Sequence, residues 1–452
     1  LYLDPNEKYL LSFDYISGPA NLGVLSDTSG YLRATDGSSS PNGLSAGNSY
    51  TFEISNSNSV NFTGFNSLTY DINNIYLTRV VSGYQDSNGK GEFRYEPPAG
   101  FLALCEDNLS RPTISDPGEH FKTVLYKGDG SAGRSITGVG FQPDLVWLKS
   151  RTNNASHRLS DSVRGVNKQL MSNTTEVEAT FTTMLTSFDS DGFALGDNAG
   201  INGSGYTNVA WCWKAGGAAV SNNDGSITSQ VSANQTAGFS IVSYTGNGAD
   251  GATVGHGLSQ APELMINKSR DVAGQDWYVY GYPNNSAFTT DGSNLRLNTT
   301  AAIVNSAVHE VSLDASVITF VDAGHPNLSG DNRIAYCFHS VEGFSKFGSY
   351  VGNGSADGPF VYCGFKPAFI MFKNADATGN WVMSDSSRDS DNPVFGYQVA
   401  EGTAIEERGT ALFDFLSNGF KMRNSWVSFN GDTNNIIFMA FAESPFQTAN
   451  AK

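Results

Sequence analysis

Three glutamates near the C-terminal end of the chain are the residues with the clearest catalytic potential. Glu401, Glu406 and Glu407 could supply the pair of carboxylates that glycoside hydrolysis requires. They lie in a polar stretch that we expect to be a solvated loop. We therefore predict that these residues do not form a catalytic pair.

Two glycine-rich segments match the dinucleotide-binding pattern G-x-G-x-x-G, at residues 128–133 (GDGSAG) and 246–251 (GNGADG). Both follow a strand-like stretch, but neither is followed by a helix-like pattern that could hold a pyrophosphate. Residues 43–47 (GLSAG) match the nucleophile elbow, which needs a strand before it and a helix after it. A strand-like stretch follows it instead. These segments predict turns and loops.

Metal and redox chemistry has little support in the sequence. The six histidines form no H-x-H or H-E-x-x-H pair. Residues 189–192 (DSDG) resemble the start of a calcium loop but lack the distal glutamate. Cys212 and Cys337 lie at matching places in apolar strands, which predicts small buried hydrophobes. We predict no cofactor, no metal site and no enzymatic activity.

Composition and charge restrict the class of partner. The 452 residues include 49 Gly, 29 Phe and 19 Tyr, which is typical of short strands joined by tight turns. The net charge of −17 would repel nucleic acids and anionic membranes. No apolar run reaches the roughly 18–20 residues of a transmembrane helix. We expect no nucleic-acid partner and no membrane insertion.

An internal repeat occurs three times. Each copy begins with a tyrosine and a glycine-rich turn, as at residues 126–130, 244–248 and 350–354. An apolar strand from a proline to a lysine follows, and each copy ends in an aromatic strand such as residues 209–213 (VAWCW). The copies are each of the size of one β-sandwich domain.

These landmarks predict an all-β chain of tandem antiparallel β-sandwiches, elongated because each copy would have its own core and adjoin the next end to end. The predicted domains are a β domain at 1–110 and repeats at 121–217, 236–343 and 344–446. The segment 216–234, rich in Ser, Asn and Gly, is expected to be a linker. Residues 178–186 are the best helix candidate.

Loops held by a rigid scaffold are where we expect binding contacts. The candidate loops are 151–157, 386–392 and 423–426. Most tryptophans lie in apolar strands and are predicted to be core residues. The candidate contacts with a glycan or partner are therefore Trp426, Arg423, Asn424 and His157.

The first repeat resembles a repeat found in tail-fibre-like structural proteins of tailed bacteriophages, chiefly marine and cyanobacterial ones. The resemblance rests on residues 140–150 (GFQPDLVWLKS), 161–165 (DSVRG), 186–193 (TSFDSDGF) and 209–214 (VAWCWK). Residues 95–105 (YEPPAGFLALC) are similar to the end of the SPRY-like domain that often precedes that repeat. The resemblance implies a virion component with a concanavalin-like or related fold and transfers no catalytic residue.

The expected function is therefore that of a virion surface protein, a tail fibre or receptor-binding protein that contacts other virion proteins and a glycan or protein of the host. A capsid decoration or vertex-knob protein is one alternative, and a secreted carbohydrate-binding adhesin is another. A depolymerase would need a carboxylate-lined groove, usually on a β-helix, and no short β-helix repeat is present. A symmetric homo-oligomer is expected, and the resemblance to phage fibres makes a trimer the first choice.

Overall fold

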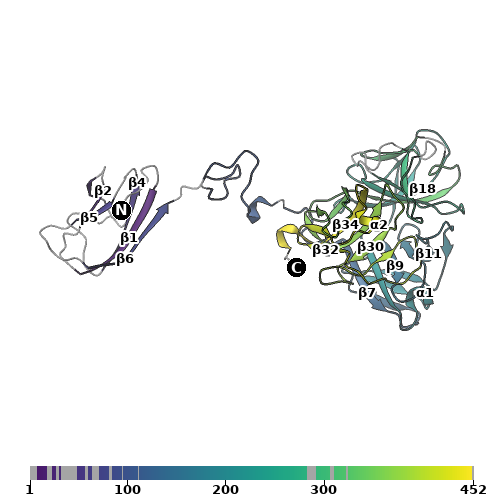
Figure 1. The fold of residues 1–452 in the computed structure, drawn as a ribbon. Coiled ribbons are helices and arrows are strands. Elements are labelled where there is room, and N and C mark those ends of the chain that lie inside the picture. Colours follow the sequence, from purple (N-terminus) through teal and green to yellow (C-terminus); the bar gives the residue numbers. More distant parts are fainter. Residues whose placement is uncertain are drawn as a thin grey trace. The chain divides into compact units, whose positions relative to one another are not determined.

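The computed structural model describes residues 84–93, 95–109, 111–281, 292–305, 310–321 and 324–449, together with the backbone of six strands between residues 8 and 80. The chain divides into two compact units, Leu1–Leu109 and Ser110–Lys452. Each unit is described by itself (Figure 1). The elbow-like residues 43–47 and His309 lie outside the described residues.

The first unit contains two antiparallel sheets. One has the order β4-β1-β6, and the other has the order β3-β2-β5. A loop after them is organised by Asp86, whose carboxylate accepts hydrogen bonds from the backbone of Ala103 and the side chain of Asn108. The elements are β1 (Lys8–Ser17), β2 (Gly23–Ser26), β3 (Gly30–Tyr31), β4 (Asn48–Ser55), β5 (Val60–Thr63), β6 (Asp71–Val80) and η1 (Glu106–Asn108).

In the second unit, each repeat has one large and one small antiparallel sheet, whose strand orders correspond in all three, and repeat 1 has in addition the two-stranded sheet β11-β12. The large sheets contain the orders β10-β9-β15-β7, β21-β20-β26-β18 and β30-β29-β34-β27. The small sheets have the orders β13-β14-β8, β24-β25-β19 and β32-β33-β28. The all-β, antiparallel sandwich class predicted from the sequence is thus confirmed, and the three copies share one topology.

The strands of repeat 1 are β7 (Phe121–Lys127), β8 (Arg134–Thr137), β9 (Leu145–Ser150), β10 (Arg158–Asp161), β11 (Lys168–Gln169), β12 (Ala179–Thr180), β13 (Leu185–Asp189), β14 (Gly192–Leu195) and β15 (Thr207–Trp213). Those of repeat 2 are β16 (Val220–Asn222), β17 (Ser229–Asn234), β18 (Phe239–Thr245), β19 (Ala252–Gly255), β20 (Leu264–Ser269), β21 (Tyr278–Gly281), β22 (Ser293–Arg296), β23 (Val304–Asn305), β24 (Val311–Leu313), β25 (Val317–Phe320) and β26 (Asn332–Phe338).

Repeat 3 contains β27 (Ser345–Val351), β28 (Phe360–Tyr362), β29 (Phe365–Asn374), β30 (Val382–Asp385), β31 (Gln398–Val399), β32 (Phe413–Leu416), β33 (Gly419–Met422) and β34 (Asn435–Pro445). The helical elements are η2 (Pro117–Glu119), α1 (Ala199–Asn202), α2 (Val427–Asn430) and η3 (Phe446–Thr448). Among the described residues, no helix is long and apolar enough to cross a membrane.

Both faces of each large sheet are buried at its central strands, as the closing strand β15 illustrates. Side chains alternate between the two faces of a strand. Val209, Trp211 and Trp213 therefore point to one face, and Ala210 and Cys212 point to the other. The second face packs against the small sheet of the same repeat. The prediction that Cys212 is a buried hydrophobe is confirmed, and Cys337 is buried in the same way.

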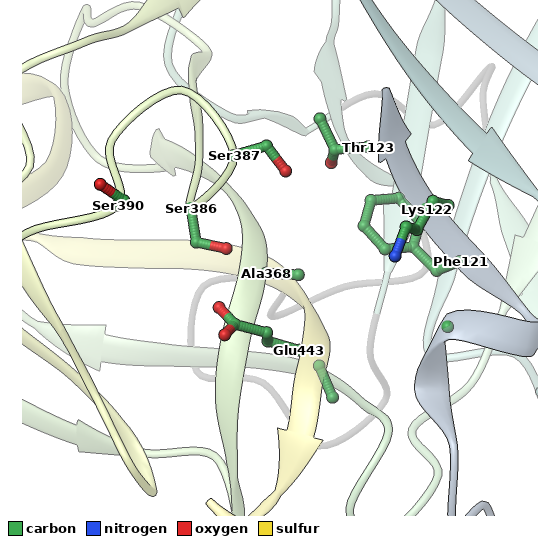
Figure 2. Close-up of a pocket in the computed structure, with 10 residues that line it drawn as sticks. Phe121, Lys122, Thr123, Ala368, Ser386, Ser387, Ser390 and Glu443 are labelled. Atoms are coloured by element: carbon green, nitrogen blue, oxygen red, sulfur yellow. The ribbon is translucent and has the colours of Figure 1, made fainter. Parts of the chain in front are cut away.

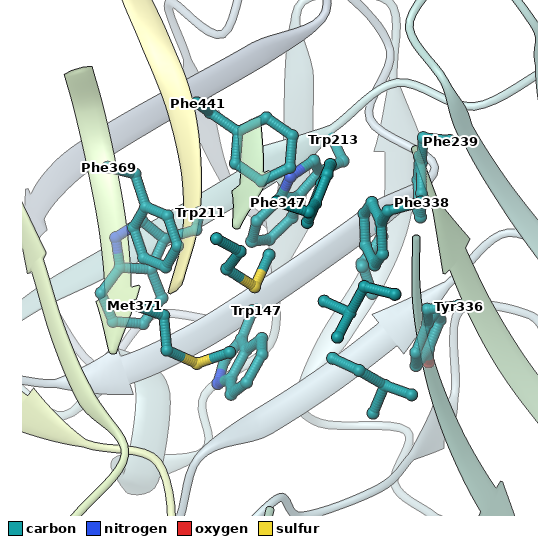
Figure 3. Close-up of a cluster of buried hydrophobic side chains, with 14 of the residues drawn as sticks. Trp147, Trp211, Trp213, Phe239, Tyr336, Phe338, Phe347, Phe369, Met371 and Phe441 are labelled. Carbon is teal, nitrogen blue, oxygen red and sulfur yellow. The ribbon is translucent and has the colours of Figure 1, made fainter. Parts of the chain in front are cut away.

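The first face of each large sheet belongs to a core that all three repeats share (Figure 3). Phe441 of repeat 3 makes ring contacts with Trp213 of repeat 1 at 5.7 Å and with Phe338 of repeat 2 at 6.1 Å between centroids. Burial of aromatic surface makes such a cluster a large source of stability. Each repeat also has a core of its own between its two sheets, as expected. The expected end-to-end arrangement is corrected: the three sandwiches pack around one common core.

Two local expectations are also corrected. The segment predicted as a linker contains β16 and β17, which extend the large sheet of repeat 2 through β18. The helix candidate at 178–186 instead contributes to strands β12 and β13. In both cases, pairing with a neighbouring strand overrides a weak local preference.

Candidate binding cleft at the junction of repeats 1 and 3

A lysine at the end of one strand in each repeat joins that repeat to its neighbour. Lys149 donates to the carbonyl of Thr403 in repeat 3, at 3.2 Å. Lys268 donates to Thr175 in repeat 1 at 3.2 Å, and Lys373 donates to Thr300 in repeat 2 at 3.0 Å. The contacts therefore form a cycle, and we call the three interfaces junctions 1/3, 1/2 and 2/3. Burial lowers the pKa of each lysine to about 8.

Each repeat also has a ring N–H that donates to a backbone carbonyl of the same repeat that its lysine contacts. The indole of Trp277 donates to Met171 of repeat 1 at 2.8 Å, and that of Trp381 donates to Arg296 of repeat 2 at 2.9 Å. His157 occupies the equivalent place at junction 1/3. Its Nδ1 accepts from the indole of Trp147, so its Nε2 donates to Val399 of repeat 3 at 3.0 Å. Burial lowers the pKa of His157 well below its usual value, so the ring is neutral.

Junction 1/3 also contains a buried ion pair. Asp385 accepts from Arg388 at 2.6 Å and from the indole of Trp211 at 3.0 Å. The guanidinium of Arg388 also lies over the ring of Trp211, 5.4 Å from its centroid. Both ionic side chains are fully buried. The loop that starts at Asp385 is therefore held firmly at its base.

Junction 1/2 repeats this arrangement with other residues. Asp161 pairs with Arg164 at 2.5 Å, and the hydroxyl of Tyr336 donates to Asp161 at 2.7 Å. At both of these junctions, a glutamate links the arginine of the buried ion pair to the neighbouring repeat. Glu178 pairs with Arg270, and at junction 1/3 Glu406 pairs with Arg151 at 2.6 Å.

Junction 2/3 lacks both ion pairs among the described residues. Gly281 ends the strand that Asp161 and Asp385 end in the other repeats. Met439 stands where Trp211 and Tyr336 stand. The backbone contact is kept, since Ile303 donates to Ala375 at 2.7 Å. The carboxylate and its hydrogen-bond donor are thus missing together.

The glycine motifs act as turns held by a buried asparagine. In repeat 1, the side chain of Asn202 accepts from the backbone of Asp129, and its carbonyl accepts from Gly130. A β-carbon on Gly128 would collide with the carbonyl of Gly203, so a glycine is required there. Asn327 and Asn430 hold the corresponding turns in the same way. The turn prediction for these motifs is confirmed.

The three candidate catalytic glutamates have separate partners. Glu406 is bound by Arg151, Arg388 and Arg408. Burial opposes its ionisation, but these arginines outweigh that effect and lower the pKa of Glu406 to about 2. Glu401 accepts from the backbone of Trp381, and burial raises its pKa. Glu407 accepts from the hydroxyl of a tyrosine. The expectation of a solvated loop is corrected for Glu406, which is the counterpart of Glu178.

The predicted contact residues fall into two groups. His157 has no exposed surface, so the structure does not bear out its assignment as a surface contact. Arg423 is exposed and pairs with Asp414 at 2.5 Å. Trp426 is half-buried against core aromatics, and Asn424 accepts from its backbone at 2.9 Å. This loop presents Arg423 and part of Trp426 at the surface.

A cleft of about 370 Å³ lies between β7 of repeat 1 and a loop of repeat 3 (Figure 2). Ser386 and Ser387 face Lys122 and Thr123 across it. Glu443 also borders it and pairs with a lysine outside the cleft at 2.6 Å. The remaining lining residues are Gly118, Phe121, Ala368, Ser390 and Ala442.

The serine loop, residues 386–392, is anchored by hydrogen bonds at both ends, and at its far end Asn392 donates to the carbonyl of Phe415 at 2.7 Å. Asp385 and Arg388 are buried below it, and the backbone of Ser386 donates to Ala368 at 2.8 Å. Junction 1/2 offers no equivalent chemistry. There Val163 stands where Ser387 stands, and the fully buried Ser240 stands where Lys122 stands.

The cleft can bind a hydroxylated ligand by hydrogen bonds. Lys122 is exposed and contributes an ammonium group, and Ser386, Ser387 and Ser390 contribute hydroxyls. Phe121 is only 2% exposed, so stacking on its ring is not available. The side-chain hydroxyl of Thr123 is buried without a partner in the described part of the chain.

The loop 386–392 was among the contact loops predicted from sequence. Lys122 and Thr123 were missed, because only the packing of repeat 1 on repeat 3 brings them to that loop.

Comparison with protein families gives one match. The family described as a domain of unknown function (DUF7483) matches residues 116–445. The match treats the three repeats as one domain, in agreement with their common core. Neither the curated proteins nor the solved structures contain a match to this chain.

Proposed function

Since the chain belongs to this family (DUF7483) over residues 116–445, we propose from its own residues that it is a non-catalytic protein of a bacteriophage virion surface. Within the virion we propose a tail fibre or receptor-binding role, in which the cleft between repeats 1 and 3 contacts a glycan of the host surface. The phage assignment rests on the sequence resemblance of repeat 1. The binding role rests on the cleft.

One observation supports a binding role above all. The charged and polar side chains in the interior, including Lys149, His157 and Glu406, form hydrogen bonds or ion pairs between repeats. Hydroxyls and an ammonium group instead line the cleft. A rigid scaffold that presents such groups suits recognition of a sugar, because fixed donors lose little conformational freedom on binding.

Glycan binding by the purified chain tests the role of the cleft. A panel of neutral and uronic-acid-containing oligosaccharides would be titrated against the chain. Lys122→Ala removes the charge, and Ser387→Trp fills the cleft. Each variant should weaken binding at least tenfold. Lys127→Ala, at an exposed position at the end of the same strand, should leave binding unchanged. Equal binding by all three variants would contradict the cleft assignment.

The virion role has a separate test. Antibodies against residues 116–445 should label the tail of intact particles. Labelling confined to the capsid would favour the alternative of a decoration or vertex-knob protein. Binding to cells with no particle association would favour a secreted adhesin. The resemblance to phage fibres makes a trimer the first choice for the oligomer, and light scattering of the purified chain measures it.

The non-catalytic assignment is tested with host polysaccharide and an assay of reducing ends. No steady release of reducing ends is expected. Release that Glu401→Gln or Glu407→Gln abolishes, in a folded variant, would contradict the assignment. Glu406 is a poor choice for this test because its loss would also break a buried ion pair.

A further inference from the structure

The edge strand β28 of repeat 3 has backbone groups that point away from its sheet. Among the described residues, strand β28 pairs with β33 on one edge and with no strand on the other. Met422 donates to Pro359 at 3.2 Å, and Cys363 donates to Asn418 at 2.8 Å. In an antiparallel pair this pattern directs the N–H and C=O groups of Phe360 and Tyr362 outward, away from β33.

The equivalent edge of repeat 2 is covered by the chain itself. Residues 225–227, which we call the strap, lie along β19 and form a parallel bridge between Ile227 and Val254. Ile227 donates to the carbonyl of Thr253 at 2.9 Å, and Thr253 donates to the hydroxyl of Ser226 at 2.9 Å. The register on β25 and β33 makes Thr253 the counterpart of Phe360.

Side-chain exposure differs accordingly. Val254 under the strap is 0% exposed, whereas its counterpart Val361 is 9% exposed. Phe360 is 48% exposed and Tyr362 is 55% exposed. Repeat 3 therefore has outward backbone groups next to exposed aromatic surface, which is the combination that pairs with an added strand.

We propose that β28 binds an extended segment of a partner polypeptide, which lies parallel to β28 as the strap lies along β19. The strap indicates the chemistry of that segment: a small hydroxyl residue followed by an aliphatic residue directed toward Val361. Acidic residues in the segment are disfavoured, because the whole chain carries a net charge of −17. The site is independent of the cleft.

Repeat 1 provides a natural contrast. Its edge strand β8 directs Ser135 and Thr137 outward, and both are exposed. Their side chains offer no aromatic surface, and the inward Ile136 is 4% exposed. Strand addition is therefore assigned to repeat 3 and not to repeat 1.

A fusion of the strap sequence to the full chain tests the proposal. Phe446 donates to Gly364 at 3.1 Å, so the C-terminal segment passes close to the end of β28. Residues 225–231 (GSITSQV) would be appended after Lys452 through a flexible linker, which gives an effective concentration in the millimolar range. Hydrogen exchange at Phe360, followed by mass spectrometry, should slow at least tenfold relative to the unfused chain.

Matched controls separate strand addition from other effects. Replacing the isoleucine of the appended copy by aspartate should restore fast exchange, and so should Tyr362→Asp in repeat 3. Thr137→Asp in repeat 1 should leave the slow exchange unchanged. Thermal melting of each variant confirms its fold.

Three outcomes would overturn the proposal. Unchanged exchange in the strap fusion would show that β28 accepts no such strand. Equal slowing by the isoleucine and aspartate copies would show that the added chain acts without specificity. Protection of Phe360 that rises with the concentration of the unfused chain would assign the edge to a second copy. None of these outcomes bears on glycan binding at the cleft, so the two proposals fail separately.

Discussion

Junctions 1/3 and 2/3 each hold two repeats together, but they do so with different side chains. Both use a buried lysine and a ring N–H that donate to backbone carbonyls of the next repeat. Only junction 1/3 adds the ion pair of Asp385 and Arg388, with Trp211 as a further donor. At junction 2/3, Met439 brings no donor and Gly281 brings no carboxylate. The contrast indicates that the backbone contacts define the assembly of repeats, and that a buried charge is kept only where all its hydrogen-bond partners are present.

The largest expected effect comes from removing the carboxylate of junction 1/3. Asp385→Ala leaves the fully buried Arg388 without its main partner and the indole of Trp211 without an acceptor. A broken buried ion pair costs about 3–5 kcal/mol. Urea denaturation followed by tryptophan fluorescence should show this loss. A conservative change at junction 2/3, Met439→Leu at the position of Trp211, should cost less than about 1.5 kcal/mol. Similar costs for the two variants would refute the contrast between the junctions.

A second prediction concerns acid. The pKa of Glu406 is lowered from 4.5 to about 2 in the folded protein. Its stabilising contribution is therefore present above pH 4.5 and is lost as the pH falls from 4.5 toward 2. Glu406→Gln should destabilise the protein by roughly 3 kcal/mol at pH 7 and should flatten the dependence of stability on pH in that range.

Glu401 provides the control for this prediction. Burial raises its pKa, so its ionised form does not stabilise the fold as that of Glu406 does. Glu401→Gln keeps an acceptor for the backbone of Trp381 and should change stability at pH 7 by less than about 1 kcal/mol. An acid dependence that is unchanged in Glu406→Gln would show that its arginine contacts do not form in solution.

Much of the fold could be predicted from local sequence. The period-two pattern of residues 209–213 and the fixed distance from proline to lysine identify strands and repeats, because these features depend on neighbours in the chain. The common core could not be predicted. An aromatic residue such as Trp213 is equally suited to a separate core or a shared one, and the sequence contains no direct signal for which face it meets.

The candidate site shows the same limit. The loop at 386–392 was predicted as a contact loop because it is polar. Lys122, across the cleft, lies in a strand far from it in sequence, and only tertiary packing joins the two. For Glu406 a signal was present: Lys149 is followed by Ser150 and Arg151, and Lys268 by Ser269 and Arg270. A repeated arginine after a repeated lysine implies a repeated acidic partner.

A smaller effect is expected at the lysine of junction 2/3. Lys373→Met removes a buried ammonium but leaves the carbonyl of Gly379 without this donor, whereas the carbonyl of Thr300 keeps the backbone N–H of Gly379 at 2.9 Å. The two effects oppose each other, so a net loss of about 1 kcal/mol is expected at pH 7.

The pKa of Lys373 is about 8 when folded, against 10.5 when unfolded. Between these values the unfolded chain binds a proton that the folded chain lacks, so this group makes stability rise with pH. The Met variant should show a flatter rise from pH 8 to 10.5, measured by urea denaturation. An unchanged slope would mean that the lysine is solvated.

The smallest effect is expected at the surface ion pair of Lys421 and Asp357. Its two charges lie 2.8 Å apart, nearly as close as the 2.5 Å of the buried pair of Asp161 and Arg164. The side chain of Asp357 is 86% exposed, however, so water solvates its charge in both the folded and the unfolded protein. Asp357→Ala should therefore change stability only slightly, and added salt should reduce even that difference. Arg164→Ala, at a similar separation but with no exposed surface, should cost several kcal/mol and should be nearly independent of salt. Urea denaturation of both variants at low and high salt makes the comparison directly. If the two costs were equal, burial would not be what distinguishes the ion pairs of the junctions from those of the surface.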